Sequence, residues 1–386
     1  MRFKFNNSSI LAPLQRVMLR DSLAAKETSH HVEQLEILFQ KEQAHSEVGL
    51  AWAETVNQTE ALQVAFLIAN DHLLSWGQAE LPSTLNYAKL QPTSWQAWLE
   101  EDRHRSLLVS GQVPWRAIYW PNEQRFIWTF HHALLDGRSI QRILTAFLER
   151  LAGGEPGRLA LAKWQVPDCE ALTLASQRFR KTRPNPEPLG FDFFKETPGG
   201  SREWCCLGEA FRRKLEFKAA AIGVTVATIL TWAWGQALIE IFEVAAVMVE
   251  QLRAGAPQVA SAGFTMNTLP ISIVRAPSNE RIKNLCEFRA QLIGLRAIET
   301  VSRFDFPVGE FPDLDAPWTS VIMIEHRTLA HLVTSKKVKS LQLHECRGET
   351  LIATGYLLPD MRLEVEGPNR QRLLKAWIQV LFQPLS

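Results

Sequence analysis

Hydrophobic and polar residues alternate along two neighbouring stretches in the first third of the chain. Residues 114–120 (PWRAIYW) and 125–130 (RFIWTF) follow a period of two, and the turn-forming residues 121–124 (PNEQ) separate them. Because successive side chains of a strand point to opposite faces, two such runs around a short polar turn are typical of an antiparallel hairpin. The pattern predicts a hairpin whose second strand ends at His131.

A helical repeat follows this hairpin directly. Apolar residues recur at helical spacing from Ile140 to Leu151, and Gly153 and Gly154 then end the run. Before the hairpin, the patterns predict helices near residues 49–62 and 94–108, with a strand over residues 63–68. We therefore expect a strand, a polar turn and a helix in succession, with the sequence HHALLDG at the turn.

The second half of the chain has its own mixture of helices and strands. A helical pattern ends at Gly223, and the hydroxyl of Thr225 can cap the apolar helix that follows. Each half supplies a sheet with helices, so the expected fold class is α+β, an α/β sandwich built twice. The β-rich runs of this half cover residues 245–252, 263–274, 318–326, 338–346 and 349–358, and an amphipathic helix over residues 369–382 closes the chain.

Composition and length suggest where the chain divides. Its 386 residues fit two domains of ordinary size, and residues 155–200 are rich in proline, glycine and charge. We place the boundary there, between an N-terminal lobe at 1–170 and a C-terminal lobe at 171–386. The 42 lysines and arginines balance 41 aspartates and glutamates, so neither a nucleic acid nor a membrane surface is an expected partner.

Cysteines and apolar runs bear on the cellular compartment. Five cysteines without a C-x-x-C pair indicate reduced thiols, and the N-terminus lacks the apolar core of a signal peptide, so we expect a cytoplasmic protein. Threonines and a glutamine interrupt the long uncharged stretch 221–239, which predicts a buried core helix rather than a membrane span.

The turn HHALLDG carries the residues best suited to chemistry. A strand end followed by a tight turn can hold an imidazole rigidly, and the ordinary pKa of histidine suits proton transfer at neutral pH. Because neighbouring strand residues face opposite ways, His131 and His132 cannot both serve one site. On spacing alone, two histidines at a strand end are more often solvated or structural than catalytic.

Four motifs in order resemble one family along nearly the whole chain, the condensation domains of nonribosomal peptide synthetases. These domains belong to the chloramphenicol-acetyltransferase-like superfamily. The motifs are LAPLQRVMLRDSLA at 11–24, HHALLDG at 131–137, GFTMNTLP at 263–270 and APWTSVIMIEH at 316–326. The resemblance implies two chloramphenicol-acetyltransferase-like lobes that form a V with a central tunnel.

The resemblance also implies an activity. A condensation domain transfers an acyl group from a carrier-protein phosphopantetheine thioester to an amine and forms an amide bond in natural-product biosynthesis. No metal or cofactor bound by the chain itself is expected. Because no adenylation or carrier motif is present, we expect acyl or peptidyl carrier proteins to act in trans, or one carrier with a free amine. An O-acyltransferase that forms an ester and a catalytically silent carrier-recruitment module of the same fold remain alternatives.

The family motif assigns roles around the turn. His132 is expected to act as general base or as an orienting hydrogen-bond acceptor for the amine, and His131 to be structural. Asp136 is expected to fix the turn, and Gly137 to permit a tight turn and leave room for a pantetheine arm.

Three further residues are candidate substrate-binding groups, each with a structural alternative. Asn267 can bond substrate or simply end a strand, and Ser320 can lie near an oxyanion or be buried in the core. His326 stands where the family commonly has asparagine, and either lines the tunnel or turns to solvent. The family's usual arginine partner of the motif aspartate is replaced by Gln63, so we expect backbone amides, Arg138 or another basic group to hold Asp136. The region after the helix that follows HHALLDG also lacks a clear counterpart of a tyrosine-containing family motif.

Overall fold

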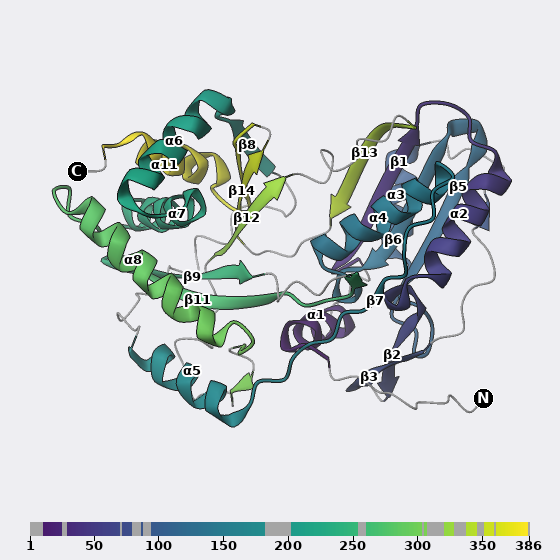
Figure 1. Cartoon of the computed structure of the whole chain (residues 1–386), viewed down its shortest axis with the longest axis horizontal. Helices are drawn as coiled ribbons and strands as arrows, with labels where there is room; N and C mark the ends of the chain where they lie inside the picture. Colours follow the sequence, from purple (N-terminus) through teal and green to yellow (C-terminus); the bar gives the residue numbers. More distant parts are fainter. Residues whose placement is uncertain are drawn as a thin grey trace. The chain divides into compact units, whose positions relative to one another are not determined.

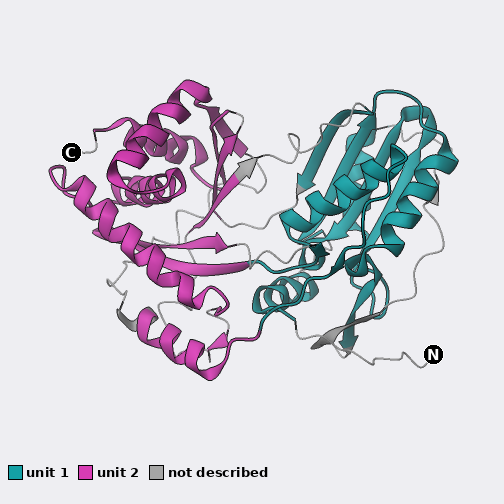
Figure 2. Ribbon diagram, viewed as in Figure 1, with its two compact units in different colours: residues 1–165, 256–266, 329–346 teal, residues 166–255, 267–328, 347–386 magenta. Residues whose placement is uncertain are grey.

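The computed structural model divides the chain into two compact units, which interleave along the sequence (Figure 2). The first unit contains residues 1–165, 256–266 and 329–346, and the second contains 166–255, 267–328 and 347–386. The structure describes residues 11–24, 29–69, 72–78, 86–87, 94–181, 202–253, 260–302, 305–306, 320–327, 337–345, 351–358 and 360–384.

A five-stranded sheet forms the centre of the first unit. Its strand order is β13-β1-β6-β5-β4, and every neighbouring pair is antiparallel except β4 and β5. The predicted hairpin of β5 and β6 is confirmed, with Trp115 opposite Phe130 and Trp120 opposite Arg125. The strands are β1 (Val32–Phe39), β4 (Asn86–Tyr87), β5 (Trp115–Trp120), β6 (Arg125–His131) and β13 (Val338–Glu345).

Helices cover both faces of this sheet (Figure 1). Helices α2 (His45–Asn57) and α4 (Gly137–Leu151) share one apolar core with β1, β5 and β6, and Trp52 packs edge-on against Trp115, Trp128 and Phe147. The predicted apolar face of α4 is confirmed, since its residues from Ile140 to Leu151 at helical spacing are buried. On the other face, Trp98 of α3 (Trp95–His104) meets Trp120, with ring centroids 4.6 Å apart.

Shorter elements complete the first unit. Helix α1 (Pro13–Ala24) precedes β1, and the 3-10 helix η1 (Glu60–Gln63) leads into the antiparallel pair β2 (Val64–Ala69) and β3 (His72–Gln78). Strand β7 (Ala160–Leu161) runs parallel to β10 (Ser261–Ala262), which brings residues 260–266 back to this unit.

A six-stranded sheet forms the centre of the second unit. Its order is β11-β9-β12-β14-β15-β8, with parallel pairing of β12 to both β9 and β14. The strands are β8 (Arg202–Cys206), β9 (Ala246–Arg253), β11 (Asn267–Val274), β12 (Val321–Arg327), β14 (Ile352–Leu358) and β15 (Arg362–Glu366). The helices of this unit are α5 (Cys169–Lys181), α6 (Gly208–Ile222), α7 (Val226–Phe242), α8 (Arg281–Leu295) and α11 (Arg370–Phe382).

Helix α7 is the buried helix of the second unit, as the uncharged stretch predicts. The predicted caps are confirmed: the hydroxyl of Thr225 accepts a hydrogen bond from the backbone N–H of Thr228, and Gly223 ends α6 with φ +75°. At Gly235 a Cβ atom would lie 2.2 Å from a side-chain carbon of Ile273, so α7 packs directly against β11.

The structure differs from the sequence-based expectations in three places. Residues 338–345 form a strand of the first unit's sheet, because β13 pairs with β1, although they lie in the proposed C-terminal lobe. The motif GFTMNTLP is split between the units after Met266. Helix α5 lies inside the stretch 155–200 that composition alone describes as a connection.

No single helix within the described ranges is long and apolar enough to cross a membrane. Helices α6 and α7 reach that composition only as a pair, and they meet at 97°. Most of α7 is buried in the core of the second unit.

Candidate functional site

His131 ends β6 and is locked by two hydrogen bonds. Its Nδ1 accepts from the backbone N–H of Ala133 at 3.1 Å, so its proton is on Nε2, which donates to the hydroxyl of Ser22 at 2.9 Å. Ser22, in α1, in turn donates to the carbonyl of His30 at 3.0 Å. This chain of bonds fixes one neutral tautomer of His131.

The surroundings of His131 oppose a positive charge. The residue is 1% exposed, and burial lowers the pKa of its imidazole well below the ordinary value. The neighbouring imidazoles of His31, His132 and His30 lower this pKa further by charge repulsion. His131 is therefore a neutral residue that orders the turn, in line with the structural role expected of it.

His132 begins the 3-10 turn η3 (His132–Leu134) and faces different groups. Its backbone N–H donates to the carbonyl of His31 at 2.8 Å, and its side chain is 21% exposed. Its Nδ1 lies 3.2 Å from Oε1 of Glu33, and the ring of Phe264 meets its ring edge-on at 6.1 Å. The imidazole is thus held between a carboxylate of β1 and an aromatic ring.

Asp136 joins the turn to residues 260–266. Its Oδ1 accepts from the backbone N–H of Ser139 at 2.9 Å, which caps α4, and its Oδ2 accepts from the backbone N–H and hydroxyl of Thr265 at 3.1 and 2.9 Å. The prediction that backbone amides hold Asp136 is confirmed. The carboxylate is 3% exposed, so these bonds replace the water it gives up.

Gly263 and Ser139 tighten the same junction. The hydroxyl of Ser139 donates to the carbonyl of Gly263 at 2.7 Å and accepts from its backbone N–H at 2.9 Å. Gly263 has φ +154°, and a Cβ there would lie 2.9 Å from the carbonyl oxygen of Ala162. A glycine is needed at this position because two backbones approach closely.

Gly137 differs from the expectation of a tight-turn glycine. It is the first residue of α4, and it is absent from the positions with positive φ among the described residues. Its backbone needs no special conformation, because the turn is closed by Asp136 instead. Within the described part of the chain, nothing lies within 4 Å of the place where its Cβ would be, so the space beside it is open.

Comparison with known proteins matches this arrangement to one family. Residues 6–158 match the sequence model of the condensation domain. The first condensation domain of the calcium-dependent antibiotic synthetase, solved with a substrate analogue, superposes with a TM-score of 0.74 at 15% identity, over 99% of this chain and 98% of that one. This is the fold of a condensation domain. The condensation domain of the monacolin K polyketide synthase MokA superposes equally well, at 12% identity over 97% and 96% of the two chains.

Relatives of known sequence are much longer proteins. One of the linear gramicidin synthase proteins of Brevibacillus parabrevis is 24% identical over 348 residues, which cover 82% of this chain and 7% of that protein. Another protein of the same synthase is 26% identical over 323 residues, covering 75% of this chain and 4% of its own length. The chain thus spans a small part of these synthase proteins, and the resemblance to synthetase condensation domains is confirmed.

Two residues that were not predicted contribute to the turn. Gln15, in the motif LAPLQ, is 1% exposed; its amide donates to the carbonyl of Ala133 at 2.8 Å, and its Oε1 accepts from Ala12. Glu33 lies in the segment HVEQ beside His132. The motif LAPLQ contains Gln15, and the segment HVEQ at 31–34, which also resembles the family, contains Glu33; only the position of Glu33 beside His132 depends on the pairing of β1 with β6.

Gln63 takes no part in holding Asp136. Its amide donates to the carbonyls of Val56 and Asn57, at 2.9 and 2.8 Å, at the end of α2. Asp136 is therefore held by backbone amides and the hydroxyl of Thr265, where the family resemblance leads one to expect arginine.

The three candidate substrate-binding residues belong to the second unit. The amide of Asn267 donates to the carbonyls of Glu299 and Val301, at 3.0 and 2.9 Å, as its strand-end alternative predicts. Ser320 is fully buried, and its hydroxyl accepts from Nε1 of Trp234 at 2.9 Å, as its core alternative predicts. His326 lies in β12, and its side chain is outside the described residues.

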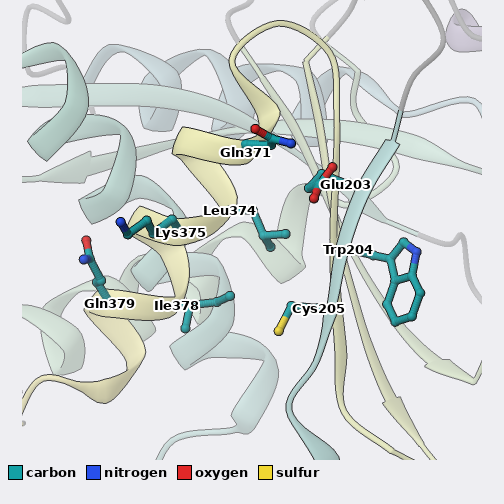
Figure 3. Close-up of a pocket in the computed structure, with 8 residues that line it drawn as sticks. All are labelled: Glu203, Trp204, Cys205, Gln371, Leu374, Lys375, Ile378 and Gln379. Carbon is teal, nitrogen blue, oxygen red and sulfur yellow. The ribbon is translucent and has the colours of Figure 1, made fainter.

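A groove in the second unit is shown in Figure 3. It lies in the second unit between the edge strand β8 and α11, and the indole of Trp204 lies across β8 from Leu374 and Ile378. None of its lining residues belongs to the unit that holds His132. In the described ranges, no group of three or more histidines, cysteines, aspartates or glutamates is arranged to hold a metal ion.

Proposed function

We propose that this chain transfers an acyl group from the phosphopantetheine thioester of a carrier protein to an amine and so forms an amide bond. The observation that carries the proposal is the placement of His132, partly exposed on a fixed strand end, in a chain that matches the condensation domain family. That family implies acyltransferase-type catalysis. The proposed setting is the biosynthesis of a nonribosomal peptide or a related natural product, with carrier proteins acting in trans.

The chemistry requires one proton acceptor near the amine. The amine attacks the thioester carbonyl, the new C–N bond forms, and the C–S bond breaks to release the pantetheine thiol. The proton lost by the nitrogen passes to His132 as general base, which then returns it to the departing thiolate, or His132 only orients the amine and the thiolate takes the proton directly. An imidazole suits either role because its ordinary pKa lies near neutral pH.

The other residues of the turn hold this imidazole in place. His131 is neutral and fixed by Ser22, and Asp136 ties the start of α4 to Thr265. A rigid support of this kind keeps a catalytic side chain within a narrow range of positions. The open space beside Gly137 is the place where the proposed pantetheine arm passes the turn.

The test is a direct assay of transfer. Carrier proteins loaded with acetyl, octanoyl or phenylalanyl thioesters are incubated with the chain and with an amine or a matched alcohol, and products are identified by mass spectrometry. We expect amide product, and a rate lower by about 10²–10⁴ in His132→Ala, the usual effect of losing a general base. The exposed His104 in α3 provides the control variant His104→Ala, which keeps its rate.

Two other outcomes would overturn the proposal. Product formed only with the alcohol identifies an ester-forming O-acyltransferase. If wild type and His132→Ala bind the carrier protein equally strongly and neither turns over any thioester, the chain is a silent recruitment module.

A further inference from the structure

A buried carboxylate lies close to Nδ1 of His132. Glu33 is 5% exposed, and its Oε1 is 3.2 Å from His132 Nδ1. It is the second residue of β1 and pairs with Phe130, two residues before His132. Two adjacent strands therefore fix the carboxylate and the imidazole relative to each other.

A carboxylate in this place has a defined chemical effect on the ring. It favours the tautomer that carries its proton on Nδ1, which leaves the lone pair on Nε2. It also stabilises the positively charged imidazolium that forms when Nε2 accepts a proton, because the opposite charges are close and partly shielded from water.

We propose that Glu33 is a positioning residue that sets the tautomer of His132 and stabilises its protonated form during transfer. The proposal rests on the proposed function, since it assigns Nε2 of His132 as the group that faces the amine. Glu33 itself touches no reacting atom, and none of the sequence motifs assigns it a role.

A second glutamate of the same strand provides a matched control. Glu36 is half-buried and also contacts a histidine, with its Oε2 2.9 Å from Nε2 of His344. Glu36 additionally pairs with Arg125, which lies over the ring of Trp95 in α3, so it lies on the face of the sheet that α3 covers. Glu36→Gln removes a half-buried carboxylate from a histidine of β13, the other neighbour of β1, and leaves the turn intact.

The first measurement is independent of activity. The full chain is labelled with ¹⁵N-histidine, and the ring signals of His132 are assigned by their loss in His132→Ala. We expect wild type to show the Nδ1-protonated tautomer when neutral. Glu33→Ala shifts the ring toward the Nε2-protonated form, whereas Glu33→Gln keeps the wild-type tautomer because an amide oxygen in the same place can face Nδ1–H. Glu36→Gln leaves these signals unchanged.

The second measurement is transfer kinetics with the acyl carrier that wild type uses best. We expect Glu33→Ala to lower kcat about tenfold or more with little change in the KM for the carrier, since an orienting partner of a catalytic histidine acts on the chemical step. Glu33→Gln, which keeps the tautomer but lacks the charge, lies between the two. Glu36→Gln keeps the wild-type kcat.

The outcomes separate this inference from the proposed function. Wild type without transfer contradicts the proposed function, while the ring signals still decide the effect of Glu33 on the tautomer. If wild type is active and Glu33→Ala has the same His132 tautomer and the same kcat as wild type, the positioning role is wrong. Should Glu33→Ala fail to fold, Glu33→Gln decides alone: the loss of the Nδ1-protonated tautomer, or a kcat equal to wild type, contradicts the inference.

Discussion

At the scale of single residues, the buried neutral imidazole of His131 links the stability of the protein to pH. Its pKa is well below the ordinary value in the folded chain, because burial and neighbouring imidazoles disfavour its charge. The unfolded chain binds a proton on this residue below about pH 6.5, whereas the folded chain does not. The free energy of unfolding is therefore at its full value above that pH and falls as the pH is lowered.

We predict that chemical unfolding shows this loss between pH 7 and pH 5, with a slope of up to about 1.4 kcal/mol per pH unit from one histidine. His131→Asn removes the titrating group and flattens the curve in that range. Burial, followed by the charges of Arg103 and Arg125, also lowers the pKa of His344. His344 therefore contributes a slope of the same sign, and this slope persists in His131→Asn. An unchanged slope in His131→Asn contradicts the assignment to His131.

Gly137 allows a test of the space beside the turn. We predict that Gly137→Ala keeps or slightly raises stability, by up to about 1 kcal/mol, because the residue is helical and has room for a Cβ. The rate of transfer from an acyl carrier is expected to fall at least about tenfold. The added methyl group fills the proposed path of the pantetheine arm and so displaces the thioester from its reactive position. Gly157→Ala, which also adds a methyl group in open space, is the control for both measurements. Equal transfer by wild type and Gly137→Ala would show that Gly137 is only a helix start.

Some residues of the candidate site follow from the sequence and others do not. His131, His132 and Asp136 belong to one short motif, so their proximity is a property of consecutive residues. Glu33 contacts His132 only because β1 pairs with β6, and Thr265 bonds Asp136 from 129 residues further along the chain. Such contacts depend on strand pairing and chain return, which a pattern of apolar positions does not encode.

At the scale of elements, the capped start of α4 is the junction that secures the turn. Asp136 accepts from Ser139 within the helix and from Thr265 outside it, so each of its two carboxylate oxygens has at least one donor. A buried acceptor that loses its matching donors costs about 1–3 kcal/mol. The stability of α4 and the position of His132 thus depend on the same side chain.

We predict that Asp136→Asn lowers the free energy of unfolding by about 1–3 kcal/mol, because its NH₂ group must face donors of Thr265 or Ser139. Thr265→Val, which removes one hydroxyl donor, costs about 0.5–1.5 kcal/mol. The control is Asp168→Asn, where an exposed aspartate accepts from the backbone N–H of Ala171 at the start of α5; we expect a change within about 0.5 kcal/mol. Urea unfolding measures all three, and equal effects at the two aspartates would contradict the double role of Asp136.

The local elements are the part of the fold that sequence predicts best. The hairpin of β5 and β6, the buried face of α4 and the cap at Thr225 each arise from neighbouring residues, so periodicity and capping rules find them. The strand character of residues 338–345 was equally visible. The pairing of this strand with β1 could not be predicted, because an alternating pattern identifies a strand but does not show which strand it pairs with.

At the scale of the whole molecule, the two units share the chain in an interleaved order. Residues 1–165 lack two parts of their own unit: β13, which pairs along the length of β1, and the segment 260–266 that holds Asp136. The first half of the sequence therefore lacks part of its own unit.

We predict that a fragment of residues 1–170 made alone is aggregated or lacks a cooperative unfolding transition, since it exposes the edge of β1 and leaves Asp136 without Thr265. Co-expression with residues 171–386 is expected to restore a folded complex, as judged by co-purification and a single melting transition. A fragment 1–170 that melts cooperatively by itself would show that the later segments are dispensable.

The pairing of β1 with β13 also determines when the first sheet can be completed during synthesis on the ribosome. Glu33 lies opposite Glu345, so the ribosome must add 312 further residues (345 − 33) before this edge of the first sheet can find its neighbour. At about 5–20 residues per second, the wait is roughly 15–60 s. During that interval β1 presents open backbone groups beside an apolar face, the arrangement that invites pairing between chains. Slower growth or lower temperature during production should therefore raise the soluble yield by reducing encounters between unfinished chains.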